Sequence, residues 1–409
     1  MGRERMASGA NALVVDESTV RTARLRVLLS CTGVERVNRG VETFFASAFG
    51  ALRKSERIMV RLLKGSGSAG ADENVAWTVC RDSTVARIVG RATGRSGYAV
   101  EQWSSVPSVL REIRFFRPQV LYTSEANLLF ALYRLRPLLG LKCVLAYSNG
   151  APLRPPFERM DVVHQVSPYH RDLAIAAGES PERHIFVPYG FDIPGQYRAL
   201  HALEKSSLRR KLGLPEERRI VLSVGWVAAE HKRMDYLVRE VAALGTQRPF
   251  VVILGKIGPE SEEIKKLASE LLGEDGHSIR SVRPEEVGQY YRAADVFALA
   301  SLKEGFGRVF VEAMVEGLPV IAHRDPVIQY VVGGQGRLID MGCPGELAKA
   351  LREEIPGSPE KRWRDMRERF SWERLLPEYE RMFEVFAGHS MWRHVPHTSR
   401  EHAAAMPNH

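Results

Sequence analysis

Short apolar runs alternate with amphipathic segments of helical length along most of the chain, from about residue 25 to residue 375. The runs have the length and composition of buried strands. The expected strands are residues 24–30, 57–63, 119–124, 142–148, 161–167, 184–190, 219–225, 249–255, 278–282, 295–300 and 318–322. The expected helices are residues 35–53, 103–116, 125–139, 168–177, 232–244, 259–272, 285–293 and 307–316. Strands that alternate with helices predict an α/β chain with two doubly wound parallel sheets.

The pattern breaks where polar residues, Pro and Gly replace the periodic segments, and these breaks predict the domain boundaries. The expected divisions are a flexible N-terminal extension at 1–24, a domain at 25–195, a hinge or linker at 196–216, a domain at 217–387 and a flexible tail at 388–409. The second domain is expected to end in a helix at residues 371–386.

Composition agrees with a globular two-domain protein. The chain has 409 residues, with 44% hydrophobic and 26% charged residues. No apolar run approaches the roughly 20 residues that a membrane-spanning helix needs, and the first 24 residues lack the apolar core of a signal peptide. The four cysteines, Cys31, Cys80, Cys143 and Cys343, are scattered, which argues against a metal knuckle or a disulfide framework. We therefore expect a reduced, cytoplasmic protein.

Positive charge is concentrated in the first half of the chain. The net charge of +9 comes entirely from residues 1–200, and nearly all of the cations there are arginines. Arginine binds phosphates through two hydrogen bonds, so an anionic partner is one interpretation, and a solvated arginine-rich surface is the other. Nucleic-acid binding is not expected, because the basic half contains no recognisable reading module.

Residues 109–118 combine three arginines with apolar residues at helical spacing. We favour an amphipathic helix packed on its own sheet. The alternative is peripheral contact with an anionic membrane on its cytoplasmic face, through Arg111, Arg114 and Arg117.

The most informative stretch is residues 301–322, SLKEGFGRVFVEAMVEGLPVIA. It forms the turn, helix and second strand of a strand–helix–strand unit, with Gly305 and Gly307 at the carboxyl end of the first strand. Ligands of open parallel sheets bind beyond those ends. The amides and positive dipole of a helix start attract anions, and glycines allow close approach. This arrangement predicts a phosphate site, in particular one for a diphosphate.

Acidic residues flank this predicted phosphate site. Arg308, Glu312 and Glu316 have the spacing of one helical stripe, which a solvated Arg–Glu pair would also explain, above all for Glu316. Glu304 precedes the helix at the mouth of the crevice, where a carboxylate is suited to accept hydrogen bonds from hydroxyls. Phosphate on the amides and hydroxyls on the carboxylates together predict a sugar nucleotide.

Residues 304–312, EGFGRVFVE, resemble the E-x7-E signature of the retaining GT-B glycosyltransferases of family 4, the group 1 glycosyl transferases. The resemblance continues in EEVGQYYRAADVFALAS before it and EAMVEGLPVIA after it, and in SVGWVAAEHKRMDYLVREV and VPYGFD. It implies two Rossmann-like domains that face a central cleft, with acceptor binding by the first domain and nucleotide-sugar binding by the second.

The resemblance also implies roles for individual residues. Glu312 would bind the ribose hydroxyls, and Glu304 would contact the transferred sugar. Lys232 would neutralise the diphosphate, which agrees with the charge that develops on a departing nucleoside diphosphate. The remaining donor-side positions are Gly225, Arg233, Arg283 and the amides of Phe306, Gly307 and Arg308, and the acceptor-side positions are Gly40 and Asn149.

Two positions depart from the family pattern. The family usually has an arginine directly after the glycine matched by Gly225, and this chain has Trp226, for which Arg233 is a candidate substitute. Many members carry a histidine where this chain has residues 148–150, Ser-Asn-Gly. His164 and His170 follow in the sequence, but a lone histidine is more often structural.

The resemblance implies a glycosyltransferase that moves a sugar from a nucleotide-sugar donor to an acceptor hydroxyl with retention of anomeric configuration. No Asp-x-Asp occurs in the sequence, so we expect no metal requirement and no cofactor besides the donor. The acceptor class stays open between a glycan, a lipid-linked acceptor and a small molecule. The alternatives are a sugar-nucleotide epimerase on the same fold and an inactive nucleotide-sugar-binding relative.

Overall fold

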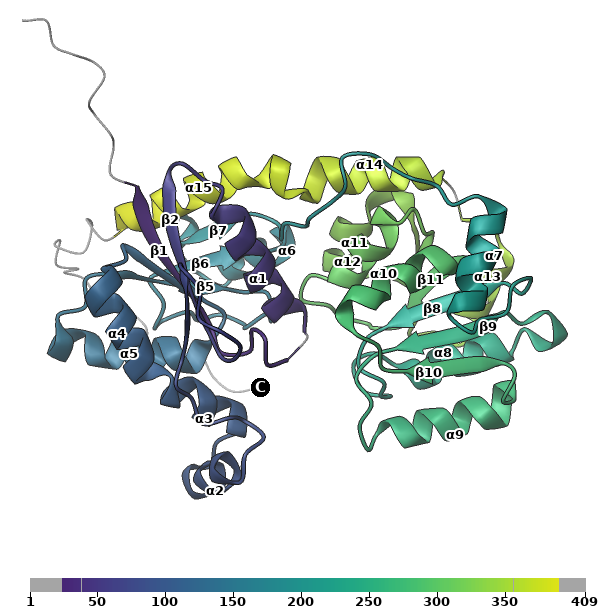
Figure 1. The fold of residues 1–409 in the computed structure, drawn as a ribbon, viewed down its shortest axis with the longest axis horizontal. Helices are drawn as coiled ribbons and strands as arrows, with labels where there is room; N and C mark the ends of the chain where they lie inside the picture. Colours follow the sequence, from purple (N-terminus) through teal and green to yellow (C-terminus); the bar gives the residue numbers. More distant parts are fainter. Residues whose placement is uncertain (1–23, 38, 356, 390–409) are drawn as a thin grey trace, which may run out of the picture.

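The computed structural model describes residues 24–37, 39–355 and 357–389. Apart from their residues next to the domains, the predicted extension (1–24) and tail (388–409) lie outside the described residues. Two parallel sheets with helices on their faces lie side by side, which confirms the predicted α/β fold class (Figure 1).

The N-terminal sheet has seven parallel strands in the order β3-β2-β1-β4-β5-β6-β7. The strands are β1 Leu25–Cys31, β2 Ile58–Lys64, β3 Glu73–Val75, β4 Val120–Thr123, β5 Val144–Ser148, β6 Val162–Gln165 and β7 His184–Phe186. The helices are α1 Gly40–Leu52, α2 Thr84–Thr93, α3 Gly97–Ser104, α4 Val106–Phe116, α5 Ala126–Leu139 and α6 Pro168–Ala176. The strand order reverses at β1, so the carboxyl ends of β1 and β4 open the crevice of this sheet.

The C-terminal sheet has six parallel strands in the order β10-β9-β8-β11-β12-β13. The strands are β8 Ile220–Val224, β9 Phe250–Leu254, β10 His277–Arg280, β11 Val296–Leu299, β12 Val320–His323 and β13 Arg337–Ile339. The helices are α7 Ala202–Lys211, α8 Met234–Ala242, α9 Ser261–Leu272, α10 Pro284–Ala293, α11 Arg308–Val315, α12 Pro326–Val332 and α13 Glu346–Arg352. Here the order reverses at β8, so the second crevice lies beyond β8 and β11.

Several elements were absent from the sequence-based expectations, notably α2, α3, α7 and the two edge strands β3 and β13. The edge strands have three residues each, too few to show a period of two. α2 and α3 are short, with ten and eight residues, and their buried faces are small, formed in α2 by Ala86 and Gly90. The apolar residues of α2 do have helical spacing, but most of them lie on its exposed side.

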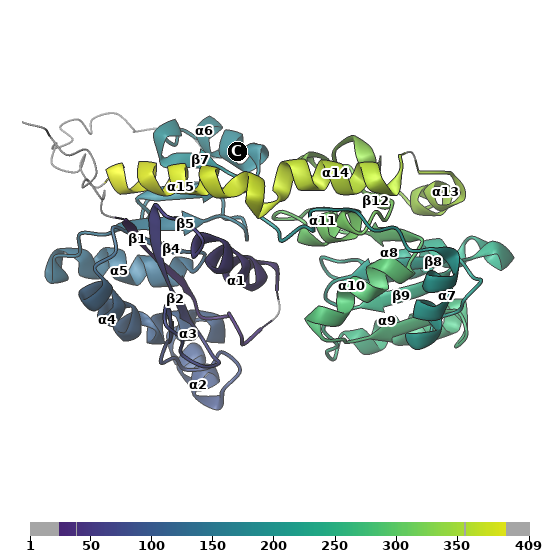
Figure 2. The same cartoon turned by 45° about the horizontal axis from the view of Figure 1, so that its top comes forward.

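Two final helices, α14 Pro359–Phe370 and α15 Trp372–Gly388, run along one side of both domains (Figures 1 and 2). They meet at Ser371, whose extended backbone caps α15. α14 contacts α11, whereas α15 contacts α1, β4 and β5. We expected the final helix as the end of the C-terminal domain, and the structure instead packs α15 on the N-terminal sheet. None of the helices in the described ranges combines the length and apolarity that crossing a bilayer requires.

The chain crosses between the domains twice, and the two crossings pair with each other. The Phe191 amide donates to the Phe370 carbonyl at 2.8 Å, and the Trp372 amide donates to the Phe191 carbonyl at 3.0 Å. The Tyr379 hydroxyl donates to the Pro188 carbonyl at 3.0 Å, which ties α15 to the first crossing. Gly190 lies so close to Trp372 that an added Cβ would be 2.5 Å from the indole ring.

We expect Gly190→Ala to destabilise the protein by about 1–3 kcal/mol, because the added methyl would force Trp372 or the crossing strand to shift. The measurement is the free energy of unfolding in urea. Gly195→Ala is the matched control, since an added Cβ there meets nothing within 4 Å. Equal stability of the two variants would show that the crossing is not tightly packed.

Candidate functional site

The loop between β11 and α11 holds the first group of predicted site residues. Gly307 has a φ of +84° and caps α11, and a Cβ there would lie 2.7 Å from the Phe310 ring. Glycine is therefore needed both for the left-handed conformation and for the close contact. Phe306 is buried, with its ring 5.3 Å from that of Tyr189 and 6.1 Å from that of Phe191. The loop that presents the start of α11 is thus anchored to the first domain crossing.

Glu304 and Lys232 form an ion pair at the carboxyl ends of β11 and β8. The Lys232 Nζ donates to the Glu304 Oε1 at 2.5 Å, and both side chains are largely buried. A Cβ on Gly225 would be 3.2 Å from the Lys232 side chain. The structure therefore brings together three residues that are 7 to 79 positions apart in sequence and that we selected independently of their distance.

Glu312 lies on the first turns of α11. Its Oε2 accepts from the Tyr291 hydroxyl at 3.3 Å, and its Oε1 is 3.8 Å from the Arg308 Nε. Burial, followed by the charge of Glu312, raises the pKa of Tyr291, so this hydroxyl keeps its proton and donates it to the carboxylate. Glu316 forms a separate ion pair with Arg292 at 3.7 Å, in agreement with the sequence-based interpretation of Glu316 as part of an Arg–Glu pair. Glu312 and Glu316 therefore have different environments on one helix.

The Arg308 side chain lies between the two domains. Its guanidinium stacks over the Phe191 ring at 4.1 Å, and a Cβ on Gly40 would be 3.3 Å from its Cδ. The side chain is only 10% exposed, and its Nε and Nη1 atoms have no hydrogen-bond partner within the described residues. Burial lowers the pKa of Arg308. From the sequence we assigned a role only to the amide of this residue. Its side chain was missed because it lies beside Gly40 and Phe191, which are distant in sequence.

Arg233 and Arg283 are separated from this group by their own contacts. Arg233 adopts a left-handed conformation, donates to the Met341 carbonyl and stacks over the Tyr236 ring at 4.4 Å. Arg283 is exposed at the start of α10, where it pairs with Glu286 at 3.1 Å. No hydrogen bond or ion pair within the described ranges joins either of them to Lys232 or Glu304. The role of Arg233 as a substitute for the arginine that Trp226 displaces therefore stays a prediction.

The N-terminal domain contributes the loop after β5. Asn149 is buried, and its amide donates to Gln165 at 2.9 Å and accepts from the Leu153 amide at 2.7 Å. These bonds make Asn149 a residue that shapes the loop. The next residue, Gly150, approaches the second domain, because a Cβ on Gly305 would be 2.2 Å from the Gly150 carbonyl oxygen. The loops that follow β5 and β11 therefore touch across the cleft.

The nearby histidine, His164, is structural. It is fully buried, with Nδ1 2.6 Å from the Tyr122 hydroxyl and Nε2 2.7 Å from the Val187 carbonyl. Burial lowers its pKa to about 4, so the ring is neutral at physiological pH. It does not supply the histidine that the family pattern places at residues 148–150.

Glu125 is a buried acid that the sequence analysis missed. It follows β4 after one residue, Ser124. Its Oε1 accepts hydrogen bonds from the Thr32 amide and hydroxyl, whereas its Oε2 has no partner among the described residues. Burial raises its pKa to about 7. The charged or titratable groups around it are Glu101, Arg81, Cys31 and Tyr98. The sequence feature that could have identified Glu125 is an acidic residue at the end of a predicted buried strand.

We expect the stability of the protein to fall between about pH 5 and pH 8 through Glu125. Its pKa is higher in the folded than in the unfolded state, so the folded state binds more protons in this window and loses stability as the pH rises. Glu125→Gln keeps the acceptor oxygen for Thr32 and removes the titration. The free energy of unfolding of this variant should exceed that of the wild type by about 1–3 kcal/mol at pH 8 and should equal it near pH 5. Parallel pH profiles of the two proteins would contradict the assignment.

We expect Arg308→Met to weaken binding of a nucleoside diphosphate by roughly tenfold and to leave binding of the nucleoside unchanged. Methionine keeps apolar contact with Phe191 but removes the unpartnered donors beside the start of α11. Calorimetry measures both affinities, with Arg292→Met as a control from the surface of the same domain. An equal loss for diphosphate and nucleoside would place the Arg308 side chain outside the phosphate site.

Comparison with protein-family models finds that residues 204–370 match the model described as glycosyl transferases group 1. A D-inositol 3-phosphate glycosyltransferase from Corynebacterium jeikeium (strain K411) is 36% identical over 182 residues, which cover 40% of this chain and 42% of the relative. An alpha-monoglucosyldiacylglycerol synthase from Streptococcus pneumoniae (strain ATCC BAA-255 / R6) is 28% identical over 156 residues, 37% of this chain and 35% of the relative. The matched part therefore spans less than half the length of these curated relatives.

Solved structures match nearly the whole chain. Anabaena Alr3699/HepE in complex with UDP-glucose has a TM-score of 0.68 at 18% identity, and the match covers 88% of this chain and all of that one. Sucrose-phosphate synthase from Thermosynechococcus elongatus also has a TM-score of 0.68, at 17% identity, and covers 89% of this chain. At these identities the likeness is evidence for the fold, and it confirms the predicted GT-B arrangement of two domains.

Proposed function

We propose that this chain, whose residues 204–370 match the model for group 1 glycosyl transferases, moves a sugar from a nucleotide-sugar donor to an acceptor hydroxyl with retention of anomeric configuration. The observation that carries the proposal is the Lys232–Glu304 pair at the start of α11, with Glu312 on the first turns of the same helix. In this proposal the Lys232 cation and the helix amides bind the diphosphate of a sugar nucleotide, and the two carboxylates bind the hydroxyls of its sugar and its ribose. UDP and UDP-glucose in the Anabaena structures support a nucleotide-sugar donor.

In the proposed reaction the bond between the anomeric carbon and the diphosphate oxygen breaks. The acceptor oxygen bonds to the same face of the anomeric carbon, and its proton passes to the departing phosphate. Lys232 and the amides at Gly307 and Arg308 stabilise the charge that develops on the leaving group. Glu312 binds the ribose hydroxyls, and Glu304 holds both Lys232 and the sugar hydroxyls in place.

We propose that the transfer needs no metal ion, because fixed positive charge of the chain takes the place of a metal at the diphosphate. The absence of Asp-x-Asp from the sequence supports this proposal. Arg308 would add a second side-chain cation near the start of α11, since its guanidinium is buried with donors that have no hydrogen-bond partner among the described residues.

The names of two relatives support a choice among the possible acceptor classes. One is named for D-inositol 3-phosphate and another for a glucosylated diacylglycerol, so a polyol or lipid-linked hydroxyl fits the proposal. An inactive nucleotide-sugar-binding relative is the second candidate. Trp226 favours this candidate because it stands where the family usually has an arginine. Asn149 favours it as well, because it lies where many members have a histidine and its side-chain amide is already hydrogen-bonded to Gln165 and Leu153.

The first test is donor binding by calorimetry, with UDP-, GDP-, ADP- and dTDP-sugars in the presence of EDTA. We expect one donor to bind and Glu312→Ala to weaken its binding by tenfold or more, since hydrogen bonds to a carboxylate contribute about 1.5–3 kcal/mol. Glu316→Ala, one turn along the helix and paired with Arg292, should bind like the wild type. Equal affinities of the two variants would refute the ribose assignment.

Turnover separates the candidate functions once the donor is known. Transfer consumes the donor only with an acceptor, and the anomeric coupling in the NMR spectrum of the product then reports retention or inversion. Epimerisation changes the donor without an acceptor. Donor binding without either reaction would establish the inactive relative.

A further inference from the structure

The outer face of α2 is an apolar stripe that no other part of the described chain covers. Val85 is 55% exposed, Ile88 62% and Val89 38%. Their spacing of three and four residues places them on one side of the helix, and Ala92 continues the stripe one turn later. Isolated exposed apolar residues are ordinary, but a stripe of this kind on one short helix indicates a surface that is covered by a partner.

The stripe cannot turn inward, because the opposite side of α2 is fitted closely to its neighbours. Ala86 is fully buried, and a Cβ on Gly90 would lie 2.5 Å from the Arg95 carbonyl oxygen. The helix begins at Ser83, whose side chain accepts from the Ala86 amide, and ends at Gly94 in the left-handed conformation. Both ends and the inner face of α2 are therefore fixed, and its orientation exposes the apolar residues.

Positive charge predominates around the stripe, where one exposed acid, Asp82, lies just before the helix. Arg87, Arg91 and Arg95 are exposed, and no acidic residue occurs between Ser83 and Val100. None of these three arginines forms an ion pair within the described ranges; Arg87 contacts the Thr84 hydroxyl, and Arg95 stacks over the Trp103 ring at 4.9 Å. The first acid after them, Glu101, is buried and paired with Arg81. An apolar stripe edged by unpaired arginines is complementary to an anionic surface with an apolar interior.

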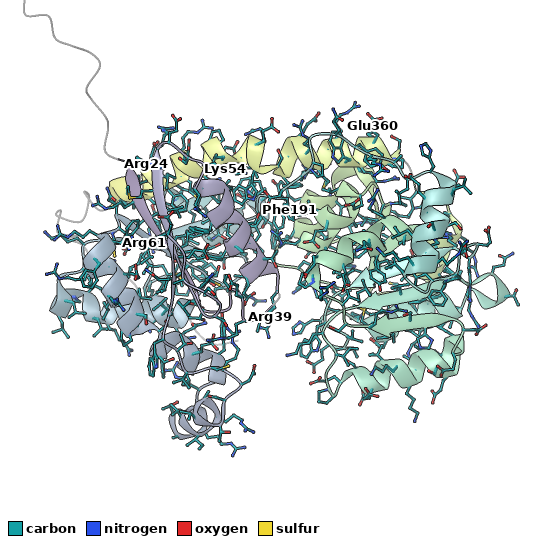
Figure 3. The ribbon with its side chains drawn as sticks, in the orientation of Figure 1. Arg24, Arg39, Lys54, Arg61, Phe191 and Glu360 are labelled. Atoms are coloured by element: carbon teal, nitrogen blue, oxygen red, sulfur yellow. The ribbon has the colours of Figure 1, made fainter. Side chains whose placement is uncertain are left out.

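The position of α2 allows it to meet an extended surface. In Figures 1 and 2, α2 and α3 project from the N-terminal domain on the side opposite α15. Figure 3 shows the same projection with its side chains, away from Arg39 at the start of α1. A lipid surface could therefore approach α2 without contacting α14 or α15.

We propose that α2 docks on an anionic lipid surface, with Val85, Ile88 and Val89 inserted among the headgroups and Arg87, Arg91 and Arg95 on lipid phosphates. The sequence-based candidate for membrane contact was residues 109–118. In the structure that segment is α4, whose Val109 and Phe116 are buried and whose Leu110 and Ile113 pack on the domain core, as the favoured interpretation expected. α4 exposes one large apolar side chain, Phe115, whereas α2 exposes three at helical spacing.

This proposal goes beyond the proposed function and does not depend on the chemistry of the donor site. It places a lipid-borne acceptor within reach of the N-terminal domain, but α2 would bind vesicles even if the chain transferred no sugar.

The test is cosedimentation of the full chain with vesicles of phosphatidylcholine alone and with vesicles that also contain phosphatidylglycerol. We expect binding only to the anionic vesicles. Val85→Gln with Ile88→Gln should reduce the partition coefficient by roughly tenfold, because it removes the inserted apolar groups. Arg87→Gln with Arg91→Gln and Arg95→Gln should reduce it by roughly 100-fold, since each arginine near an anionic surface contributes about one kcal/mol.

Two controls carry matched changes on other exposed surfaces. Leu138→Gln changes an apolar residue on α5 that is more exposed than any of the α2 residues, and Arg111→Gln with Arg114→Gln and Arg117→Gln changes three arginines on and after α4. Both should bind vesicles like the wild type. All variants are exposed substitutions, and circular dichroism with donor calorimetry reports whether each one is folded.

Three outcomes would overturn the proposal. The wild type could fail to bind anionic vesicles, or the α4 variant could lose binding while the α2 variants keep it. The third outcome is a wild-type dimer in light scattering that Val85→Gln with Ile88→Gln dissociates, which would assign the stripe to a second copy of the chain. Failure of donor binding with intact vesicle binding would refute the proposed function alone.

Discussion

The paired crossing of the chain between the two sheets is the constraint on which the cleft depends. Two reciprocal backbone hydrogen bonds join Phe191 to Phe370 and Trp372, so the outgoing and returning segments form one short ribbon. Because the α15 that follows packs on α1, β4 and β5, the N-terminal domain is held by an element encoded at the other end of the chain. Small residues such as Gly190 make this possible, since they allow the ribbon to lie directly against an indole ring.

The site inherits its geometry from this constraint. The Phe306 ring, which anchors the β11–α11 loop, packs on Tyr189 and Phe191 of the first crossing. The Arg308 guanidinium stacks on Phe191, and its aliphatic stem lies close to Gly40, so the first residue of α11 contacts the first crossing and faces the N-terminal domain. A change in domain angle would move Phe191 and Gly40 relative to Arg308, and would alter the burial of its charge. Domain closure and the electrostatics of the donor site are therefore physically linked.

Much of the fold followed from periodicity alone. All eleven expected strands overlap observed strands. Buried parallel strands are continuous apolar runs, and such runs can be recognised from a few consecutive residues. The short helix α2, the edge strands and the attachment of α15 to the first domain did not follow from it. The apolar residues of α2 have helical spacing but lie on one short, exposed segment, and the edge strands are too short to show a period. The attachment of α15 depends on packing between residues distant in sequence.

The sequence by itself predicted a phosphate site at the start of α11, with Glu304 beside it, because a helix start after a parallel strand has a defined electrostatic character. The family resemblance added Lys232 and the role of Glu312 to that prediction. Tertiary structure alone decided which candidates meet. It joined Lys232 to Glu304, turned Arg233 toward Met341, closed the side chain of Asn149 on its own loop and buried the guanidinium of Arg308 between the domains. The reason is that direction and burial of a side chain depend on neighbours that are distant in sequence, whereas the polarity of a helix start depends only on the local backbone.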